Sequence, residues 1–466
     1  MRTAIEVVGV LSTMYAAGLN LSYLALWPLA RRGLAREVRK RSWTWHEEAF
    51  ASPLTPGISI LVAAYNEQAT IIDATASLLA QRYPTFELVV VDDGSTDATA
   101  ARLIETYGLE QVVPAARGEL SYTPVSTVWH TAWPHPITLI QKCNGGRADA
   151  LNCGLDVARH SHVCITDADS ILDPDALSVM VRPVLEDPQR VIAVAGTIRI
   201  ANSCRFESGR LLEARMPRNG LAALQVVEYL RAFLFGRLGW DAINSLMIVS
   251  GAFGLFRRDV LMEAGGYWAD TVGEDLELTI RLHRHMRDRG REYRIAYAPD
   301  PICWTEVPED AATLGRQRRR WHRGLWESLW RHRAMFGRRR YGVPGMVALP
   351  YLLVFEFGGP LIEALAWVMF PIGLAYHMVD PWLVGAFVLC AWLLGTLTTV
   401  AACWLEETGY RHYQRPRELV QLLLLALVEN LGYRQLIDAF RLAAVWDLLL
   451  RRGSWGRMPR RGFSSM

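Results

Sequence analysis

Two apolar blocks bracket a long mixed block, and this arrangement constrains the fold more than any other feature of the chain. The first apolar stretch, Ile5 to Ala30, carries almost no charge. Because a bilayer crossing needs about 20 apolar residues, this stretch is long enough to span a membrane. The second block contains two further candidates, Met346 to Tyr376 and Trp382 to Leu405. We therefore expect membrane-spanning helices on both sides of the block between them.

Basic residues predict the orientation of the first stretch. Six of them lie between Arg31 and Arg41, and positively charged flanks favour the cytoplasmic side. A signal peptide would have its charges before the apolar stretch and a small-residue cleavage site after it. Neither is found, so residues 1–41 are expected to be a retained anchor with a basic flank. The block that follows is expected to be cytoplasmic.

The stretch from Leu419 to Leu450 leaves two alternatives open. Its first half is apolar, but charged residues then recur at roughly helical spacing, as in helices that lie in the membrane interface. It ends the helical region 346–450 and precedes a basic tail, 451–466, that favours a cytoplasmic C-terminus. A cytoplasmic C-terminus agrees with one crossing before the mixed block and two after it, provided that the last segment does not add one further crossing.

Charge and cysteine content exclude some classes of protein. The net charge of +3 is too small to indicate a nucleic-acid partner, and the basic clusters lie beside apolar runs, where they favour anionic lipid. The seven cysteines have no CxxC or metal-finger spacing. Only Lys40 and Lys142 are lysines among fifty basic residues. Lysine is a compact charge that suits phosphate, although an arginine-rich composition also explains its rarity.

The mixed block alternates β-branched runs with helical stretches, as in a sheet covered by helices. The expected strands are Ile58–Tyr65, Glu87–Asp93, Ile137–Lys142, His162–Asp169 and Val191–Ile200, with helices beginning near Glu67, Thr96, Arg147 and Asp175. Residues 111–136 form a long connection without periodicity, and 221–249 is apolar and basic enough to be a helix against the membrane. Several polar residues follow the predicted strands, where open α/β sheets bind ligands.

Two acidic motifs end predicted strands. Asp92-Asp93-Gly94-Ser95 can accept hydrogen bonds from a nucleoside, but Asp and Ser also cap helices. Asp167-Ala168-Asp169 follows an apolar run, and its carboxylates suit a hard divalent cation whose shell a diphosphate completes. A DxD sequence is common in solvated turns, so its position after a buried strand is what favours a metal site.

Two further motifs follow. Gly273-Glu274-Asp275 precedes a predicted helix, Leu276 to Met286, whose dipole favours the ionised carboxylate that a general base needs; acidic residues at helix starts also serve stability alone. Gln317-Arg318-Arg319-Arg320-Trp321 lies in a basic helix. Its tryptophan offers a face for a sugar ring and its arginines can bind a diphosphate, while an interfacial helix has the same composition.

The chain resembles the membrane-spanning family 2 glycosyltransferases, which include cellulose, hyaluronan, chitin-oligosaccharide and poly-N-acetylglucosamine synthases. The resemblance covers roughly residues 58–335. It rests on motifs in a fixed order, namely Tyr65-Asn66-Glu67, Asp92 to Ser95, the turn from Lys142 to Asn152, the DxD, the Glu274-Asp275 pair and Gln317 to Trp321. It implies a GT-A fold, a Rossmann-like mixed α/β sheet in a cytoplasmic domain, with N- and C-terminal transmembrane helices in a bacterial inner membrane.

The resemblance also implies roles for individual residues. Tyr65, Glu67 and Asp93 would bind the uridine of a UDP-sugar, and Lys142 would approach the nucleotide. Asp167 and Asp169 would face the diphosphate and a Mg²⁺ or Mn²⁺ ion, with Asp169 the direct ligand. Asp275, beside Glu274, would be the base of an inverting transfer. Gln317, Arg320 and Trp321 would hold the diphosphate and the growing polysaccharide.

Two residues depart from the family pattern: Gly273 replaces a threonine, and Arg147 replaces a lysine. Three functions are compatible with the chain: a polysaccharide synthase, an enzyme that transfers one sugar to a lipid, and an inactive nucleotide-sugar-binding subunit. Export or regulatory subunits would be further partners. The polar residues Glu356, Glu363, Glu429 and Asn430 would either line a translocation path or pair between helices. The sugar and its linkage do not follow from the sequence.

Overall fold

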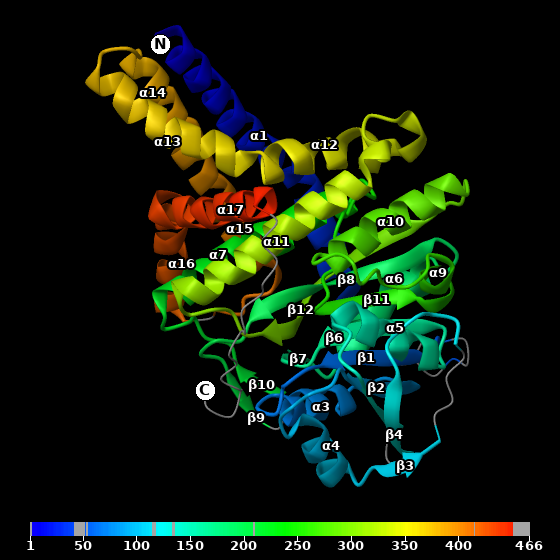
Figure 1. Cartoon of the computed structure of the whole chain (residues 1–466). Coiled ribbons are helices and arrows are strands. Elements are labelled where there is room, and N and C mark those ends of the chain that lie inside the picture. Colours follow the sequence, from blue (N-terminus) through cyan, green and yellow to red (C-terminus); the bar gives the residue numbers. More distant parts are fainter. Residues whose placement is uncertain are drawn as a thin grey trace. The chain divides into compact units, whose positions relative to one another are not determined.

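The chain folds into two compact units (Figure 1). The computed structural model describes residues 2–41, 52, 55–113, 118–132, 136–207, 210–413 and 415–450. The helical unit holds the described residues of Met1–Val38, Met216–Ser245 and Pro308–Arg457, and the sheet unit holds those of Arg39–Arg215 and Leu246–Val307. Residues 216–245 and 308–331, which the sequence placed in the block 58–335, thus pack with the apolar helices. The predicted tail 451–466 lies outside the described residues.

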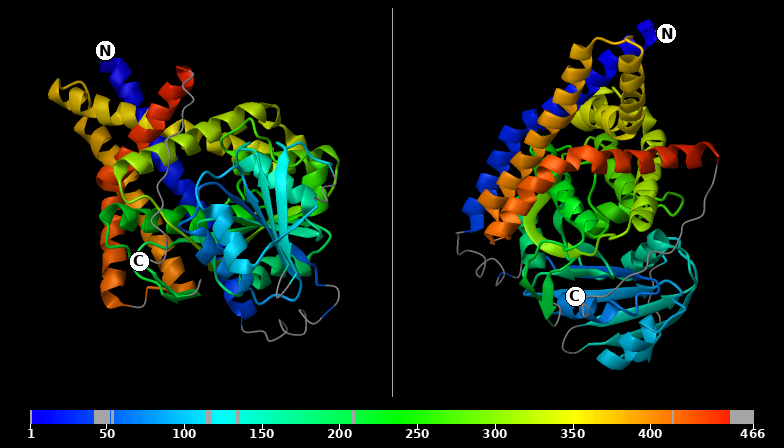
Figure 2. Two further views of the ribbon diagram at one scale, coloured as in Figure 1. Left: turned by 60° about the horizontal axis from the view of Figure 1, so that its bottom comes forward. Right: turned by 90° about the vertical axis from the view of Figure 1, so that its left-hand side faces the viewer.

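The sheet unit is built on a mixed ten-stranded sheet, whose order is β3-β4-β5-β2-β1-β6-β11-β8-β12-β7. Its strands are β1 (Ile58–Ala64), β2 (Phe86–Asp92), β3 (Glu110–Val112), β4 (Val125–Thr131), β5 (Ile137–Lys142), β6 (His162–Asp167), β7 (Ser170–Leu172), β8 (Val191–Ile200), β11 (Phe253–Arg257) and β12 (Arg294–Thr305). The neighbours β5, β2, β1 and β6 are parallel. The strands of residues 58–142, blue to cyan, lie side by side in Figure 2. A separate hairpin joins β9 (Arg205–Glu207) to β10 (Arg210–Glu213).

Helices cover this sheet, and most of them are amphipathic. They are α3 (Ile71–Leu79), α4 (Thr99–Tyr107), α5 (Arg147–Val157), α6 (Ala176–Glu186), α9 (Arg258–Glu263) and α10 (Glu274–Asp288). Helix α5 packs on β1 and β2, and α6 packs on β8 and β12. In α3, Ile71, Ala74 and Leu78 are buried at helical spacing, so that one side of the helix faces the interior.

The predicted strands are found, with small differences at their ends. Ile137–Lys142 and Val191–Ile200 have the predicted bounds. The predicted strand His162–Asp169 ends at Asp167, and Ala168 and Asp169 form a turn before the short strand β7. The connection 111–136 was expected to lack regular structure, but it contributes β4, which pairs with β5.

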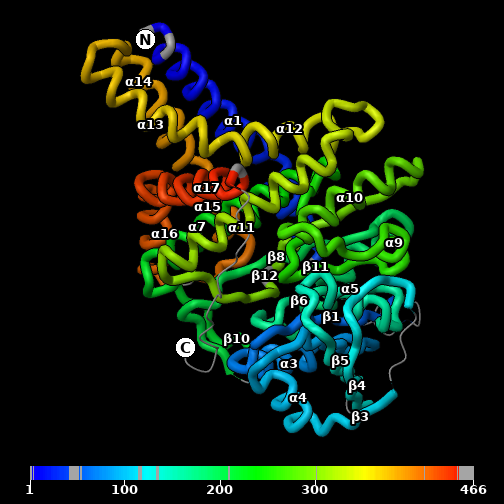
Figure 3. Tube along the Cα trace, viewed as in Figure 1, coloured from blue at the N-terminus to red at the C-terminus, as the bar shows by residue number. Residues whose placement is uncertain are grey.

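The helical unit contains the three candidate membrane spans found among the described residues: Ile5–Lys40, Pro344–Ala375 and Pro381–Gly409. They contain the three predicted apolar stretches, apart from Tyr376 at the end of the second. The helices of this unit are α1 (Arg2–Arg41), α7 (Gly220–Tyr229), α8 (Arg237–Asp241), α11 (Ala311–Arg331), α12 (Leu349–Tyr351), α13 (Gly359–Ala375), α14 (Pro381–Val388), α15 (Gly395–Gly409), α16 (Pro416–Val428) and α17 (Arg434–Leu449). The trace in Figure 3 shows α1 beside α13, where Ala16, Ala366 and Phe370 belong to one buried cluster.

The last apolar segment is not a continuous helix. Leu431 has extended dihedral angles, with φ −116° and ψ 104°, and Gly432 has φ +90°, so the helix breaks between α16 and α17. Glycine adopts such a positive φ without a steric penalty. The 16 residues of α17 are fewer than the roughly 20 that a crossing needs, and this helix packs against α11 and α13. The interfacial alternative from the sequence agrees with this geometry.

The polar residues of the apolar helices pair with other helices. The carboxylate of Glu363 accepts from Nε of Arg434 at 3.0 Å, and that of Glu429 accepts from Arg231 at 2.8 Å and from Thr399 at 2.7 Å. Glu356 lies 3.8 Å from Arg441. These contacts favour the pairing alternative for the glutamates.

Candidate functional site

The predicted acidic motifs converge because four parallel strands end at one edge of the sheet. The register places Ala64 opposite Asp92, Ala63 opposite Asp167, and Asp92 opposite Gln141. Residues that follow these positions must therefore lie close together. Tyr65, Asp93, Lys142 and Asp167 come from the four strand ends, as the sequence predicted for a ligand-binding edge.

The loops after β1 and β2 are hydrogen-bonded to each other. The backbone N–H of Asn66 donates to Oγ of Ser95 at 2.9 Å, and Oδ1 of Asn66 accepts from the N–H of Thr96 at 2.8 Å. The N–H of Glu67 donates to Oγ1 of Thr99 at 2.9 Å. Tyr65, at the start of this pair of loops, is about half exposed. Its ring is thus available to a ligand.

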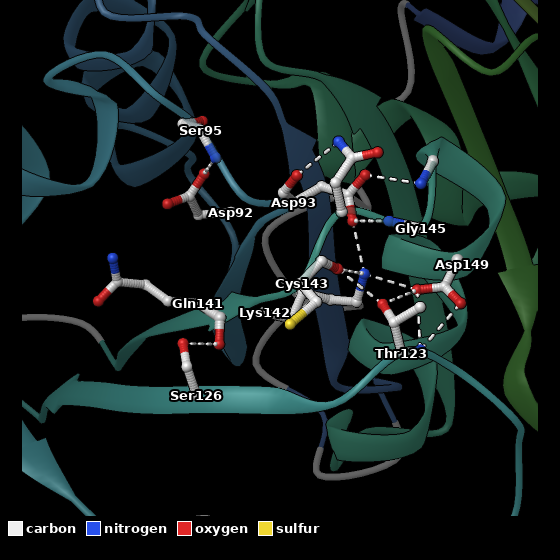
Figure 4. Close-up of polar contacts among 12 residues, drawn as sticks. Asp92, Asp93, Ser95, Thr123, Ser126, Gln141, Lys142, Cys143, Gly145 and Asp149 are labelled. Atoms are coloured by element: carbon white, nitrogen blue, oxygen red, sulfur yellow. Dashed lines mark hydrogen bonds and ion pairs between the residues drawn. The ribbon is translucent and has the colours of Figure 1, made fainter.

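Lys142 lies in a buried cluster of charges (Figure 4). Its Nζ donates to Oδ1 of Asp93, to Oδ1 of Asp149 and to the carbonyl oxygen of Cys143, the last at 2.8 Å. An ammonium group has three protons, and these are three acceptors. Burial acts to lower the pKa of Lys142, but the hydrogen bonds to Asp149 and Asp93 outweigh it and raise the pKa.

Asp93 also holds the turn that leads into α5. Its Oδ1 accepts from the N–H of Gly145 at 3.0 Å, and its Oδ2 from the N–H of Gly146 at 2.7 Å. The side chain of Lys142 is fully buried and that of Asp93 nearly so. Both were predicted to contact the nucleotide. Their contacts within the protein give them a structural role, and a direct nucleotide contact stays a prediction.

Arg147, the first residue of α5, joins two of the acidic motifs. Its Nη2 and Nε donate to Oδ1 of Asp167, at 2.7 and 3.1 Å, and its Nη1 donates to Oε1 of Glu274 at 2.9 Å. Burial acts to lower the pKa of Arg147, but the charges of Asp167 and Glu274 outweigh it and raise the pKa. The sequence had singled out this residue only as a departure from the family pattern.

Asp275 lies in the first turn of α10, next to Glu274. Its Oδ2 accepts from the backbone N–H of Gly251 at 3.2 Å, and its Oδ1 from the N–H of Leu276 at 2.8 Å. The side chain is only partly buried. Glu274 shares Arg147 with Asp167, so the residue next to the predicted base is joined to the DxD motif through one arginine.

Asp169 lies in the turn after β6 and is 2% exposed. Burial raises the pKa of the nearby Cys303 thiol well above its usual value, and Asp167 and Asp169 add to this effect. Within the described residues, no three His, Cys, Asp or Glu side chains are grouped so that they could hold a metal ion. The carboxylates of Asp167 and Asp169 would therefore need ligand oxygens to complete a coordination shell.

The Gln317–Trp321 motif belongs to α11 of the helical unit. Arg318 is buried, donates to Glu228 at 2.8 Å and lies over the ring of Trp321, with Cζ 4.3 Å from the ring centroid. Arg320 and Trp321 are exposed, and Gln317 is half-buried. Because residues three and four apart share a helix face, these three predicted residues lie on one face.

Sequence reasoning missed Asp149 and Gly251. Asp149 is buried within α5 and pairs with Lys142 and with the hydroxyl of Thr123, at 2.9 Å. An acidic residue in the first turn of a helix is too common to indicate a functional site. Gly251 precedes β11, and the run of small residues around it is a weak signal of close packing.

A mixed sheet with acidic motifs at one edge, followed in the chain by apolar helices, defines a membrane-associated enzyme of GT-A type. A mannosyltransferase from Pyrobaculum calidifontis, solved with GDP-Man and Mn²⁺, is similar in fold. Its TM-score is 0.52 at 22% identity, over 96% of this chain and 100% of that chain. Residues 56–324 match the family described as glycosyltransferase like family 2. The chain belongs to this family.

Curated relatives include poly-beta-1,6-N-acetyl-D-glucosamine synthases. The protein from Staphylococcus epidermidis is 29% identical over 276 residues, which are 59% of this chain and 56% of that protein. The protein from Staphylococcus aureus strain COL is 30% identical over 277 residues, again 59% of this chain and 56% of that protein. The chain thus spans little more than half the length of the curated relatives it matches.

Proposed function

We propose that the chain is an inverting, metal-dependent glycosyltransferase that transfers hexosyl or N-acetylhexosaminyl units from a UDP-sugar to a growing polysaccharide. The shared contact of Arg147 with Asp167 and Glu274 carries this proposal, because it joins the predicted diphosphate site to the residue next to the predicted base, Asp275. Family membership supports sugar transfer, and the names of the curated relatives support a polymer product.

In the proposed reaction, Asp275 takes the proton of the acceptor hydroxyl. The acceptor oxygen then attacks the anomeric carbon on the face opposite UDP. The bond from that carbon to the diphosphate breaks, and the configuration inverts. The N–H of Gly251 fixes one carboxylate oxygen of Asp275, which orients the base.

Asp167 and Asp169 fit a divalent ion, since their hard oxygen atoms are the ligands that Mg²⁺ and Mn²⁺ prefer. When bound, such an ion would neutralise charge that develops on the departing UDP. One oxygen of Asp167 is engaged by Arg147. This supports Asp169 as the main ligand.

Tyr65 and Glu67, with the backbone around Asp93, would hold the uridine, and Lys142 would act by fixing that backbone. Gln317, Arg320 and Trp321 would hold the diphosphate and the acceptor end. Arg318 lies over the ring of Trp321, and this tryptophan is exposed, so a sugar could reach it. The enzyme would lie in the bacterial inner membrane as a multi-pass protein, with its catalytic domain in the cytoplasm. It would export the polymer, with or without partner subunits.

The test is incubation of the detergent-solubilised protein with Mg²⁺ or Mn²⁺ and a panel of UDP-sugars, followed by measurement of UDP release and product size. We expect one donor to give UDP and a polymer, and EDTA to stop the reaction. D275N should lower the rate about a hundredfold or more. D288N, at the other end of the same helix, is the control and should leave the rate unchanged.

Three outcomes would contradict parts of the proposal. UDP release by D275N at the wild-type rate would exclude Asp275 as the base. A product with one sugar on a lipid would favour the single-transfer alternative. Absence of UDP release from every donor would favour a binding subunit.

A further inference from the structure

Both backbone groups of Gly251 are used at the candidate site. Its carbonyl oxygen accepts from Nη2 of Arg147 at 2.8 Å, and its N–H donates to Oδ2 of Asp275 at 3.2 Å. One residue therefore links the arginine that contacts Asp167 and Glu274 to the predicted base. The path runs from Asp167 through Arg147 and Gly251 to Asp275.

Space at Gly251 is taken by the guanidinium group of Arg147. A Cβ atom at this position would lie 2.8 Å from Nη2, 2.9 Å from Nη1 and 3.0 Å from Cζ. Such contacts are too short, so one group would have to move. The arginine tip is held by hydrogen bonds to Asp167, Glu274 and Gly251 itself, so moving it would break several of them.

The backbone conformation gives no other reason for glycine here. The φ angle of Gly251 is outside the left-handed region, unlike that of Gly94 or Gly146. A left-handed φ, which strains a residue with a Cβ atom, is therefore not what requires glycine here. The requirement is therefore for room beside Arg147.

We propose that Gly251 is a positioning residue for sugar transfer. Its peptide group couples the guanidinium group of Arg147 to the carboxylate of Asp275. Because glycine has no side chain, the guanidinium group has room beside it. This inference rests on the proposed function, and it adds a residue that acts through Asp275 without touching the substrate. Displacement of Arg147 would leave the base misaligned by a fraction of an ångström, which affects turnover more than binding.

The test is a double-mutant cycle between G251A and R147K. Lysine at 147 lacks Nη1 and Nη2, the two atoms that the alanine methyl group would meet first, so the two substitutions should not add. We expect G251A to lower kcat about tenfold or more in the wild-type background, with the Kd of UDP changed less than about threefold. In the R147K background, G251A should change kcat less than about twofold. G220A is the control, because no atom lies within 4 Å of a Cβ there.

Melting temperatures provide a second measurement of the same coupling. G251A should lower the melting temperature of the wild type but not that of R147K, and R147M replaces R147K if the latter does not fold. Equal losses from G251A in both backgrounds would overturn the inference. A lower melting temperature with unchanged kcat would reduce Gly251 to a purely structural residue. If the wild type released no UDP at all, the proposed function would fail, while the melting temperatures would still test the contact.

Discussion

Lys142 and Asp93 form a buried ion pair at the ends of the adjacent parallel strands β5 and β2. Together with Asp149 and the carbonyl of Cys143, Asp93 uses all three protons of the ammonium group. The match between three protons and three acceptors explains why one of the two lysines in this arginine-rich chain occurs here. A guanidinium group is planar and larger, and it cannot present three donors from one atom.

K142R is therefore expected to destabilise the sheet unit by about 1–3 kcal/mol, because a larger side chain must enter a fully buried site. K142M should cost about 3–5 kcal/mol, since it leaves Asp93 and Asp149 without their cation. The matched control is K40R, whose ion pair with Glu186 is partly exposed and should change stability by less than about 0.5 kcal/mol. Denaturant unfolding in detergent measures all three. An equal effect of K142R and K40R would contradict the three-acceptor account.

Neighbouring arginines of the Gln317–Trp321 motif should behave differently. R318M removes the buried partner of Glu228 and is expected to lower stability by about 3 kcal/mol. R320M changes an exposed side chain, so stability should shift by less than about 0.5 kcal/mol while UDP release falls at least about tenfold. Thermal unfolding and UDP release of the same preparations separate the two effects. Full activity of R320M would remove Arg320 from the proposed site.

The pair of Glu363 and Arg434 provides a test of the polar residues in the apolar helices. E363A leaves the half-buried guanidinium group of Arg434 without this carboxylate and should cost about 1.5–3 kcal/mol. E356Q alters a longer and more exposed contact and should be tolerated. Polymer export from vesicles that contain E356Q then tests the translocation hypothesis. Unchanged export would exclude a role for Glu356 in the path.

Acidification should destabilise the sheet unit through two buried histidines. Burial lowers the pKa of His283 and of His162 to about 4 from an ordinary value near 6.5. Between these values the unfolded chain binds more protons, so stability is present above pH 6.5 and is lost as the pH falls toward 4. Each histidine should contribute about 2 kcal/mol of loss between pH 7 and pH 5.

H283Q tests whether His283 causes part of the loss of stability on acidification, because glutamine can still donate to the carbonyl of Leu246 but does not titrate. Melting temperatures at pH 7 and pH 5 should differ less than in the wild type, but a difference should remain because His162 still titrates. An unchanged difference would mean that His283 is not the titrating group.

Local sequence patterns predicted the strands that carry the site. Runs such as Ile137–Lys142 are buried and β-branched enough to be recognised without tertiary information. Strand β12 contains prolines at 299 and 301, which argue against a strand, and the structure accommodates them with register shifts. Strand β4 is fixed by Gln141, whose side chain accepts from Thr127 and Trp129 at 2.8 Å. Such partners are visible only after folding.

The same limit applies to the candidate site. The order of the motifs predicted which acidic residues converge, because parallel strands bring their ends to one edge. Arg147 is 20 residues from Asp167 and 127 from Glu274, so its bridging position follows from no local spacing. The burial of Lys142 could not be predicted from local spacing either. Lysine is seldom fully buried unless charged partners surround it, and these partners come together only on folding.

The loops after β1 and β2 have a consequence for ligand affinity. Asn66, Glu67, Ser95, Thr96 and Thr99 already restrain one another through reciprocal hydrogen bonds. The conformational entropy lost in ordering them is therefore lost on folding, and a nucleoside that enters there loses little more. Amide protons of these loops should exchange slowly even before a ligand is added.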